Sequence, residues 1–100
     1  MPSQRKARAG KRRTFDVINP ATGKALATYP ILTAHQVRTK VEGAREAFRS
    51  WSRLDPKERA AYLLRFAEVL RKHKASYAET MTLEMGKVIR EAIAEVEKCA

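Results

Sequence analysis

Ile18-Asn19-Pro20-Ala21-Thr22-Gly23-Lys24 separates two stretches of the chain that have strand character. Thr14–Ile18 is β-branched and aromatic with a partial alternation, and Ala25–Tyr29 can pair with it. The Asn-Pro pair initiates a turn through the asparagine side chain and the fixed proline φ, and Gly23 can take the left-handed conformation. The stretch therefore predicts a β-hairpin with a five-residue loop, whose second strand ends at Pro30.

The segment after the hairpin predicts two amphipathic helices with their own start signals. Thr33 and Gln36 have capping-box spacing, in which each side chain bonds the other residue's backbone N–H. Asp55-Pro56 starts the second helix, with proline in the first turn, where its missing N–H costs nothing. The apolar residues of the first helix recur at spacings of three and four and form one stripe: Val37, Val41, Ala44, Phe48 and Trp51.

Two further helices are expected, from about Ala75 to Met85 and from near Val88 onward, with Gly86 as the stop of the first. The helix that starts at Asp55-Pro56 is apolar over much of its circumference, so neighbouring elements are predicted on more than one of its sides. A hairpin and four amphipathic helices have wide apolar faces, suited to packing against a sheet that these residues do not contain. The apolar helical face that runs to Ala100 suggests truncation.

The net charge of +10 is concentrated at one end. The rest of the chain is only mildly basic, whereas six basic residues precede the first acid, Asp16. These six residues are Arg5, Lys6, Arg8, Lys11, Arg12 and Arg13. Residues 1–13 are therefore predicted to be a disordered basic leader. Three interpretations of it stay open: a solvated extension, a phosphate-binding segment, or a transit peptide that lacks the usual Leu/Phe face.

No apolar run approaches the roughly 18 residues that a membrane span needs, and no signal-peptide core follows the basic start. The single cysteine, Cys99, leaves no internal disulfide and fits a reducing compartment. A cytoplasmic protein without membrane association is expected.

A second motif, Thr82-Leu83-Glu84-Met85-Gly86-Lys87, follows the hairpin motif by about sixty residues. Together with Trp51-Ser52 and Asp55-Pro56-Lys57-Glu58-Arg59, the two motifs resemble the N-terminal portion of an aldehyde dehydrogenase. Met81–Lys87 followed by Glu95–Ala100 is most similar to the succinate-semialdehyde dehydrogenase branch. The resemblance covers about residues 15–100. It implies an α/β fold for the intact enzyme, of which residues 14–100 form the first, truncated part of the dinucleotide-binding domain.

The resemblance implies an enzyme that oxidises a small-molecule aldehyde, succinate semialdehyde in that branch, to its carboxylic acid with NAD or NADP. A homo-oligomer is implied at full length. The family's nucleophilic cysteine, glutamate base, oxyanion-hole asparagine and dinucleotide-binding glycine loop all lie downstream of this segment. No catalytic or cofactor-binding residue is therefore expected here, and the isolated chain is expected to be inactive. Cys99, on an apolar helical face, is predicted to be a small core residue.

One candidate metal site follows from the resemblance. The Glu84 side chain and the main-chain carbonyl of Ile18 would help to hold a monovalent cation, which suits hard oxygen ligands. The alternative is that Glu84 and Lys87 pair or cap around the Gly86 turn. His35 and His73 lack neighbours at metal-ligand spacing and are predicted to be solvated.

Two rival interpretations remain at this stage. The first is a small basic helical module that holds nucleic acid through residues 5–13, although the concentration of the positive charge in the leader argues against nucleic acid as a partner. The second is a remnant of a truncated reading frame that helps no reaction.

Overall fold

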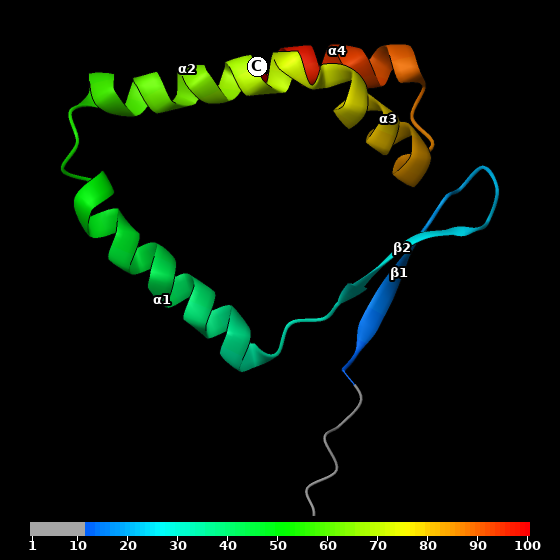
Figure 1. Ribbon diagram of the computed structural model, residues 1–100, viewed down its shortest axis with the longest axis horizontal. Coiled ribbons are helices and arrows are strands. Elements are labelled where there is room, and N and C mark those ends of the chain that lie inside the picture. Colours follow the sequence, from blue (N-terminus) through cyan, green and yellow to red (C-terminus); the bar gives the residue numbers. More distant parts are fainter. Residues whose placement is uncertain (1–11) are drawn as a thin grey trace, which may run out of the picture.

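The computed structural model describes residues 12–100 as an antiparallel hairpin followed by four helices (Figure 1). This arrangement confirms the predicted element order. Most of the predicted leader, residues 1–11, lies outside the described residues. The elements have these bounds: β1 Thr14–Ile18, β2 Ala25–Pro30, α1 Ala34–Trp51, α2 Pro56–Lys72, α3 Lys74–Met85 and α4 Ile89–Cys99.

The hairpin is held by side chains as well as by its backbone ladder. Phe15 lies opposite Tyr29, with the ring centroids 5.8 Å apart. Beside that pair, the Thr28 hydroxyl donates to the Asp16 carboxylate over 2.6 Å. Six residues lie between the bounds of the two strands, where a five-residue loop was predicted. Within the paired strands the register is irregular between Val17 and Ile18, which lie opposite Ala27 and Ala25 and leave Leu26 without a partner in the register.

Both predicted helix starts are confirmed as caps. The Thr33 hydroxyl accepts from the backbone N–H of Gln36 at 3.2 Å, and the Gln36 side chain accepts from the Thr33 N–H at 2.9 Å. Asp55 accepts from the N–H of Lys57 at 2.8 Å, and the Glu58 carboxylate accepts from the Asp55 N–H at 3.0 Å. This second capping box fixes the corner between α1 and α2.

The core of the described chain is small and lies where α4 packs against α3. Ala78 of α3 and Ala92 of α4 are fully buried, and Val96 is nearly so. On the outside of this pair, Glu97 of α4 accepts a 2.6 Å hydrogen bond from Lys74 and lies 3.9 Å from Arg71 of α2. Glu97 therefore ties α4 to the corner between α2 and α3, and α4 runs beside α2 in Figure 1.

The molecule is one layer thick rather than globular. Its shortest extent is 15 Å, little more than one helix diameter, and its radius of gyration is 20.6 Å, against about 13 Å for a compact chain of this length. Large apolar side chains are exposed along every element, among them Phe48 and Leu64. The expectation that the helical faces lack their neighbours is confirmed. Within residues 12–100 no helix is long and apolar enough to cross a membrane.

Candidate functional site

The hairpin loop is a rigid turn built around Asn19. The Asn19 backbone N–H donates to the Lys24 carbonyl at 2.9 Å, and the Asn19 carbonyl accepts from Gly23 at 2.8 Å. The Asn19 side chain accepts from the N–H of Ala21 at 2.9 Å, and this residue is 9% exposed. Gly23 takes φ +69°, as its predicted left-handed role requires. The loop is thus held at a fixed angle to β1.

The two sequence motifs meet in space at this loop. Gly86 ends α3 in the left-handed conformation, with φ +72°, and its N–H bonds the Thr82 carbonyl. A Cβ placed on Gly86 would lie 3.1 Å from Cγ of Pro20, so the proline ring rests against the glycine. In Figure 1 the hairpin loop correspondingly reaches the connection between α3 and α4. We call this contact the Pro20–Gly86 junction.

Ile18 and Glu84, the candidate cation ligands, flank the Pro20–Gly86 junction. Ile18 ends β1 two residues before the proline, and Glu84 lies in the last turn of α3 two residues before the glycine. Both residues are exposed. The junction therefore brings together the two segments that carry these oxygens. No group of three or more His, Cys, Asp or Glu side chains gathers in the described part of the chain.

The alternative prediction, in which Lys87 pairs with Glu84, is wrong. Lys87 forms its ion pair and hydrogen bond with Glu95 of α4 instead. The lysine leaves α3 beyond the Gly86 turn, so its side chain reaches the second turn of the following helix rather than the end of the preceding one. Glu95 is too far along the sequence for local spacing to have suggested it.

The two lysine–glutamate pairs of α4 give its anchoring a defined pH window. The hydrogen bond to Glu95 raises the pKa of Lys87 above its usual 10.5, and the hydrogen bond from Lys74 lowers the pKa of Glu97 below its usual 4.5. Because the pKa of Lys87 is raised, its pair with Glu95 stabilises the fold below pH 10.5, and this stabilisation is lost as the pH rises through the raised pKa. Because the pKa of Glu97 is lowered, its pair with Lys74 stabilises the fold above pH 4.5, and this stabilisation is lost as the pH falls through the lowered pKa.

We therefore expect the helix signal of α4 to be insensitive to pH between about 4.5 and 10.5 and to weaken outside that window. Circular dichroism of the chain across the pH range measures this. In Glu97→Gln the weakening at the acid side should diminish while that at the alkaline side remains. An acid limb that is identical in Glu97→Gln would contradict the role given to Lys74 and Glu97.

Cys99 was predicted to be a core residue, and this prediction is wrong for the described chain, because its thiol is exposed. It lies on the side of α4 that faces a hollow along α2, with a volume of about 520 Å³. Nothing among residues 12–100 covers that side. We call this hollow the α2–α4 groove; its lining residues are Ala60, Leu63, Leu64, Phe66, Ala67, Cys99 and Ala100.

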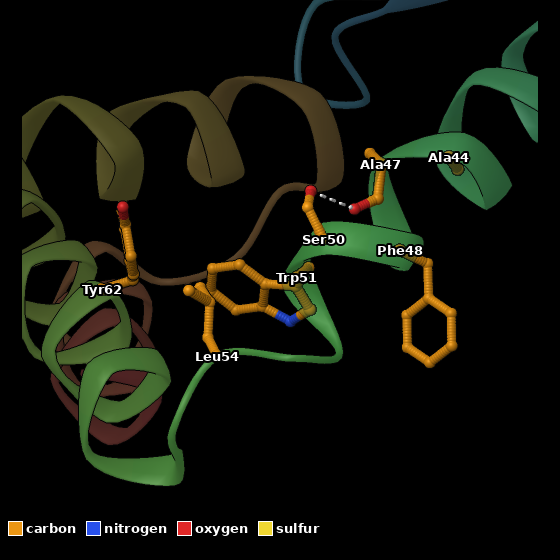
Figure 2. A pocket seen from close by; sticks show the side chains of 7 residues that line it. All are labelled: Ala44, Ala47, Phe48, Ser50, Trp51, Leu54 and Tyr62. Carbon is orange, nitrogen blue, oxygen red and sulfur yellow. Dashed lines mark hydrogen bonds between the residues drawn. The ribbon is translucent and has the colours of Figure 1, made fainter.

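A second apolar hollow, of about 560 Å³, lies at the corner between α1 and α2 (Figure 2). The Trp51 ring points toward Leu54 and meets the Tyr62 ring edge-on, with centroids 5.2 Å apart. Phe48 points away into the open. Phe48 and Trp51 share the predicted apolar stripe of α1; Trp51 packs on Tyr62 at this corner, whereas Phe48 stays exposed. Arg65 lies over the outer face of the Tyr62 ring, 4.5 Å from its centroid.

His35 and His73 are exposed, as predicted. His73 occupies the junction between α2 and α3 and lies 6.1 Å from the Tyr77 ring. His35 lies in the first turn of α1.

The sequence comparisons with known proteins point to one enzyme family. Residues 7–100 match the aldehyde dehydrogenase family. The chain is 37% identical over all its 100 residues to the NADP(+) succinate-semialdehyde dehydrogenase of Deinococcus radiodurans, and 40% identical over 86 residues to malonate-semialdehyde dehydrogenase 2 of Oceanobacillus iheyensis. It covers 21% and 18% of those two proteins, so it spans about a fifth of their length.

The fold comparison agrees. The crystal structure of the NADP-dependent glyceraldehyde-3-phosphate dehydrogenase from Bacillus halodurans C-125, complexed with NADP, superimposes with a TM-score of 0.83 at 30% identity. The match covers 91% of this chain and 19% of that one. The single layer, which has almost no core of its own, therefore has the arrangement of the same segment in a complete enzyme.

Proposed function

Because the chain belongs to the aldehyde dehydrogenase family, we propose that it forms the N-terminal part of the dinucleotide-binding domain of an NAD(P)-dependent aldehyde dehydrogenase. The observation that carries this proposal is the arrangement of hairpin and helices, which matches a dehydrogenase at a TM-score of 0.83. The Pro20–Gly86 junction supports it, because it joins the two motifs that define the segment. In this proposal residues 14–100 belong to the domain. The carbonyl of Arg13, which was predicted to lie in the leader, accepts a 2.8 Å hydrogen bond from the N–H of Ile31 and so extends the hairpin.

We propose a short aldehyde that carries a carboxylate at its other end, succinate semialdehyde first, as the substrate of the intact enzyme. The named relatives act on succinate and malonate semialdehydes. Overall, aldehyde, water and oxidised cofactor would give carboxylate, reduced cofactor and protons. NADP is favoured over NAD, since one of these relatives is named for NADP(+) and the solved neighbour holds NADP.

The described residues do not themselves fit a dinucleotide. The sequence contains no G-x-G-x-x-G loop. At the start of α2 the Asp55 carboxylate already accepts from the free Lys57 N–H, and its negative charge would repel a phosphate there. The start of α1 is likewise closed by Thr33. We therefore assign no cofactor contact and no catalytic role to this chain, and expect it alone to be catalytically silent.

A chimeric enzyme tests this function. In it, the segment of the Deinococcus radiodurans dehydrogenase that matches this chain is replaced by residues 1–100. We expect NADP-linked oxidation of succinate semialdehyde within about tenfold of the parent enzyme, while the isolated chain gives no turnover. A chimera that folds like the parent but shows no turnover would overturn the proposal. The parent without the segment is the control, and it should be inactive.

We further propose that the Ile18 carbonyl and the Glu84 carboxylate take part in a monovalent cation site of the intact enzyme. Carboxylate and carbonyl oxygens suit a hard cation. Their placement on the two sides of the Pro20–Gly86 junction supports the pairing. Two oxygens do not complete a coordination shell, so the others would come from water or from other parts of the enzyme.

Replacement of Glu84 by glutamine is expected to remove the effect of this cation. In the chimeric enzyme, K⁺ should raise the melting temperature by about 2 °C over tetramethylammonium at equal ionic strength, because it binds the folded state alone. Glu84→Gln should lose this increment. Glu79→Gln, an exposed change on the same helix, should keep it. An unchanged increment in Glu84→Gln would remove that carboxylate from the site.

We propose, finally, that the intact enzyme is a cytoplasmic homo-oligomer. The single cysteine and the absence of a helix suited to spanning a membrane in residues 12–100 are compatible with the location. Fractionation of host cells and light scattering of the intact enzyme test the two parts. Recovery from a membrane fraction would contradict the first, and a monomeric mass the second.

A further inference from the structure

Asn19 is the one polar residue among residues 12–100 that is buried, at 9% exposure. The other buried residues lie between α3 and α4, whereas Asn19 lies in the hairpin loop. A polar side chain is costly to bury unless it is hydrogen-bonded. The Asn19 carboxamide meets this condition within its own turn, since its oxygen accepts from the N–H of Ala21 at 2.9 Å. The buried side chain therefore holds the backbone on either side of it.

The peptide bond before Asn19 has a fixed direction. The Ile18 carbonyl and the Asn19 N–H belong to one planar, trans peptide unit, so they point in opposite directions. The N–H donates across the hairpin to the Lys24 carbonyl at 2.9 Å. The Ile18 carbonyl therefore points away from Lys24, toward the outer side of the hairpin.

The pairing of the strands gives the same direction independently. Before β1, the Arg13 carbonyl accepts from the N–H of Ile31 at 2.8 Å, so Arg13 faces inward as Asn19 does. In an antiparallel pair, residues that bond the partner strand alternate with residues whose backbone groups face outward. The irregular register leaves its extra residue on β2, so the alternation along β1 is unbroken and Ile18 faces outward. Its carbonyl lies on the edge of β1 that no other strand in residues 12–100 covers, where a cation can reach it.

We propose that Asn19 is a positioning residue for the monovalent cation site, where it holds the Ile18 carbonyl in the direction that a cation needs. Besides its N–H and its side chain, the Asn19 carbonyl is also fixed, since it accepts from the N–H of Gly23 at 2.8 Å. The peptide unit that carries the Ile18 carbonyl is thus oriented before any cation binds. The inference rests on the proposed function, because it takes the Ile18 carbonyl and the Glu84 carboxylate as ligands.

Titration of the chimeric enzyme with K⁺, at an ionic strength kept constant with tetramethylammonium, tests this role. Asn19→Ala removes the acceptor of the Ala21 N–H but leaves both ligand oxygens in place. We expect the K⁺ concentration that gives half of the rise in melting temperature to increase about tenfold, as is usual when a residue that orients a metal ligand is lost. An unchanged half-maximal concentration would overturn the inference.

Two variants of the same loop separate positioning from a general loss of stability. The Thr22 hydroxyl is exposed and accepts from the Lys24 N–H at 3.3 Å. Thr22→Val should therefore weaken the loop without changing the response to K⁺. Asn19→Asp keeps an acceptor for the Ala21 N–H and should restore the K⁺ response that the alanine variant loses. The same change of response in Thr22→Val and Asn19→Ala, or no recovery in Asn19→Asp, would contradict the positioning role.

Hydrogen exchange in K⁺-free buffer measures the orientation of the peptide unit without the cation. In the chimeric enzyme, a peptide that spans the hairpin loop is followed by mass spectrometry. It should exchange faster in Asn19→Ala than in the unchanged chimera, and at the unchanged rate in Asn19→Asp. Equal protection in all three proteins would show that the side chain does not hold this peptide unit, and would overturn the inference.

These outcomes stay separate from those of the proposed function. A K⁺ response that Glu84→Gln abolishes and Asn19→Ala leaves unchanged would reject the positioning role alone. An active chimera without any K⁺ response would reject the cation site, and the positioning role with it, while the proposed reaction stands. A folded chimera without turnover, in which Asn19→Ala still weakens the K⁺ response, would reject the reaction alone.

Discussion

Replacement of Gly86 by alanine is expected to lower the free energy of unfolding of the chain by about 2–3 kcal/mol and to detach the hairpin loop. Two costs add at this residue. Its φ of +72° lies in the left-handed region, where a side chain costs roughly 1–2 kcal/mol. The new Cβ would also lie 3.1 Å from Pro20 Cγ, closer than normal van der Waals contact, so the ring must move away.

Gly23 separates these two costs. It has nearly the same φ, +69°, but a Cβ there meets nothing within 4 Å. Gly23→Ala should therefore show the conformational cost alone, and Gly86→Ala about 1 kcal/mol more. Urea unfolding followed by circular dichroism measures both. Amide exchange of Ala21 and Gly23 should accelerate in Gly86→Ala, as the loop loses its support. Equal losses for the two variants would mean that the Pro20–Gly86 junction contributes nothing.

Local chemistry explains why the order of elements could be predicted from the sequence. Thr33 and Gln36 specify a helix start through bonds that span three residues, and Asp55 does the same at α2. The turn at Asn19 closes through its own side chain within two residues. Each of these signals is complete within one turn of chain, so the burial of the element does not affect it.

The candidate site depended on contacts between distant segments, and there prediction was weaker. The pairing of Lys87 with Glu84 is an alternative that their proximity in the sequence suggests, but the turn at Gly86 directs Lys87 to Glu95 on the next helix. Cys99 was assigned to a core from its place on an apolar stripe. An apolar stripe shows which face of a helix is suited to burial, but that face is buried only where another element packs on it. Residues 12–100 contain no such element for the face that carries Cys99.

Replacement of Ala92 by leucine is expected to cost about 3 kcal/mol and to separate α4 from α3. Ala78 and Ala92 are both fully buried between the two helices, where small side chains let the backbones approach closely. A leucine at Ala92 adds three carbons where no space is left, and overpacking of this kind costs typically 1–3 kcal/mol or more. Because the described core contains little else, α3 and α4 have few other contacts to compensate.

Ala94→Leu is the matched control, because Ala94 lies on the same helix but is exposed. The same side chain there should change the stability by no more than about 0.5 kcal/mol. Urea unfolding by circular dichroism compares the two, and amide exchange at Val96 reports on α4 alone. In the chimeric enzyme Ala92→Leu should also lower the yield of folded protein. If both variants matched the unchanged chain, the alanine contact would not hold these helices, and the order of α4 would have to come from the Lys74–Glu97 and Lys87–Glu95 pairs.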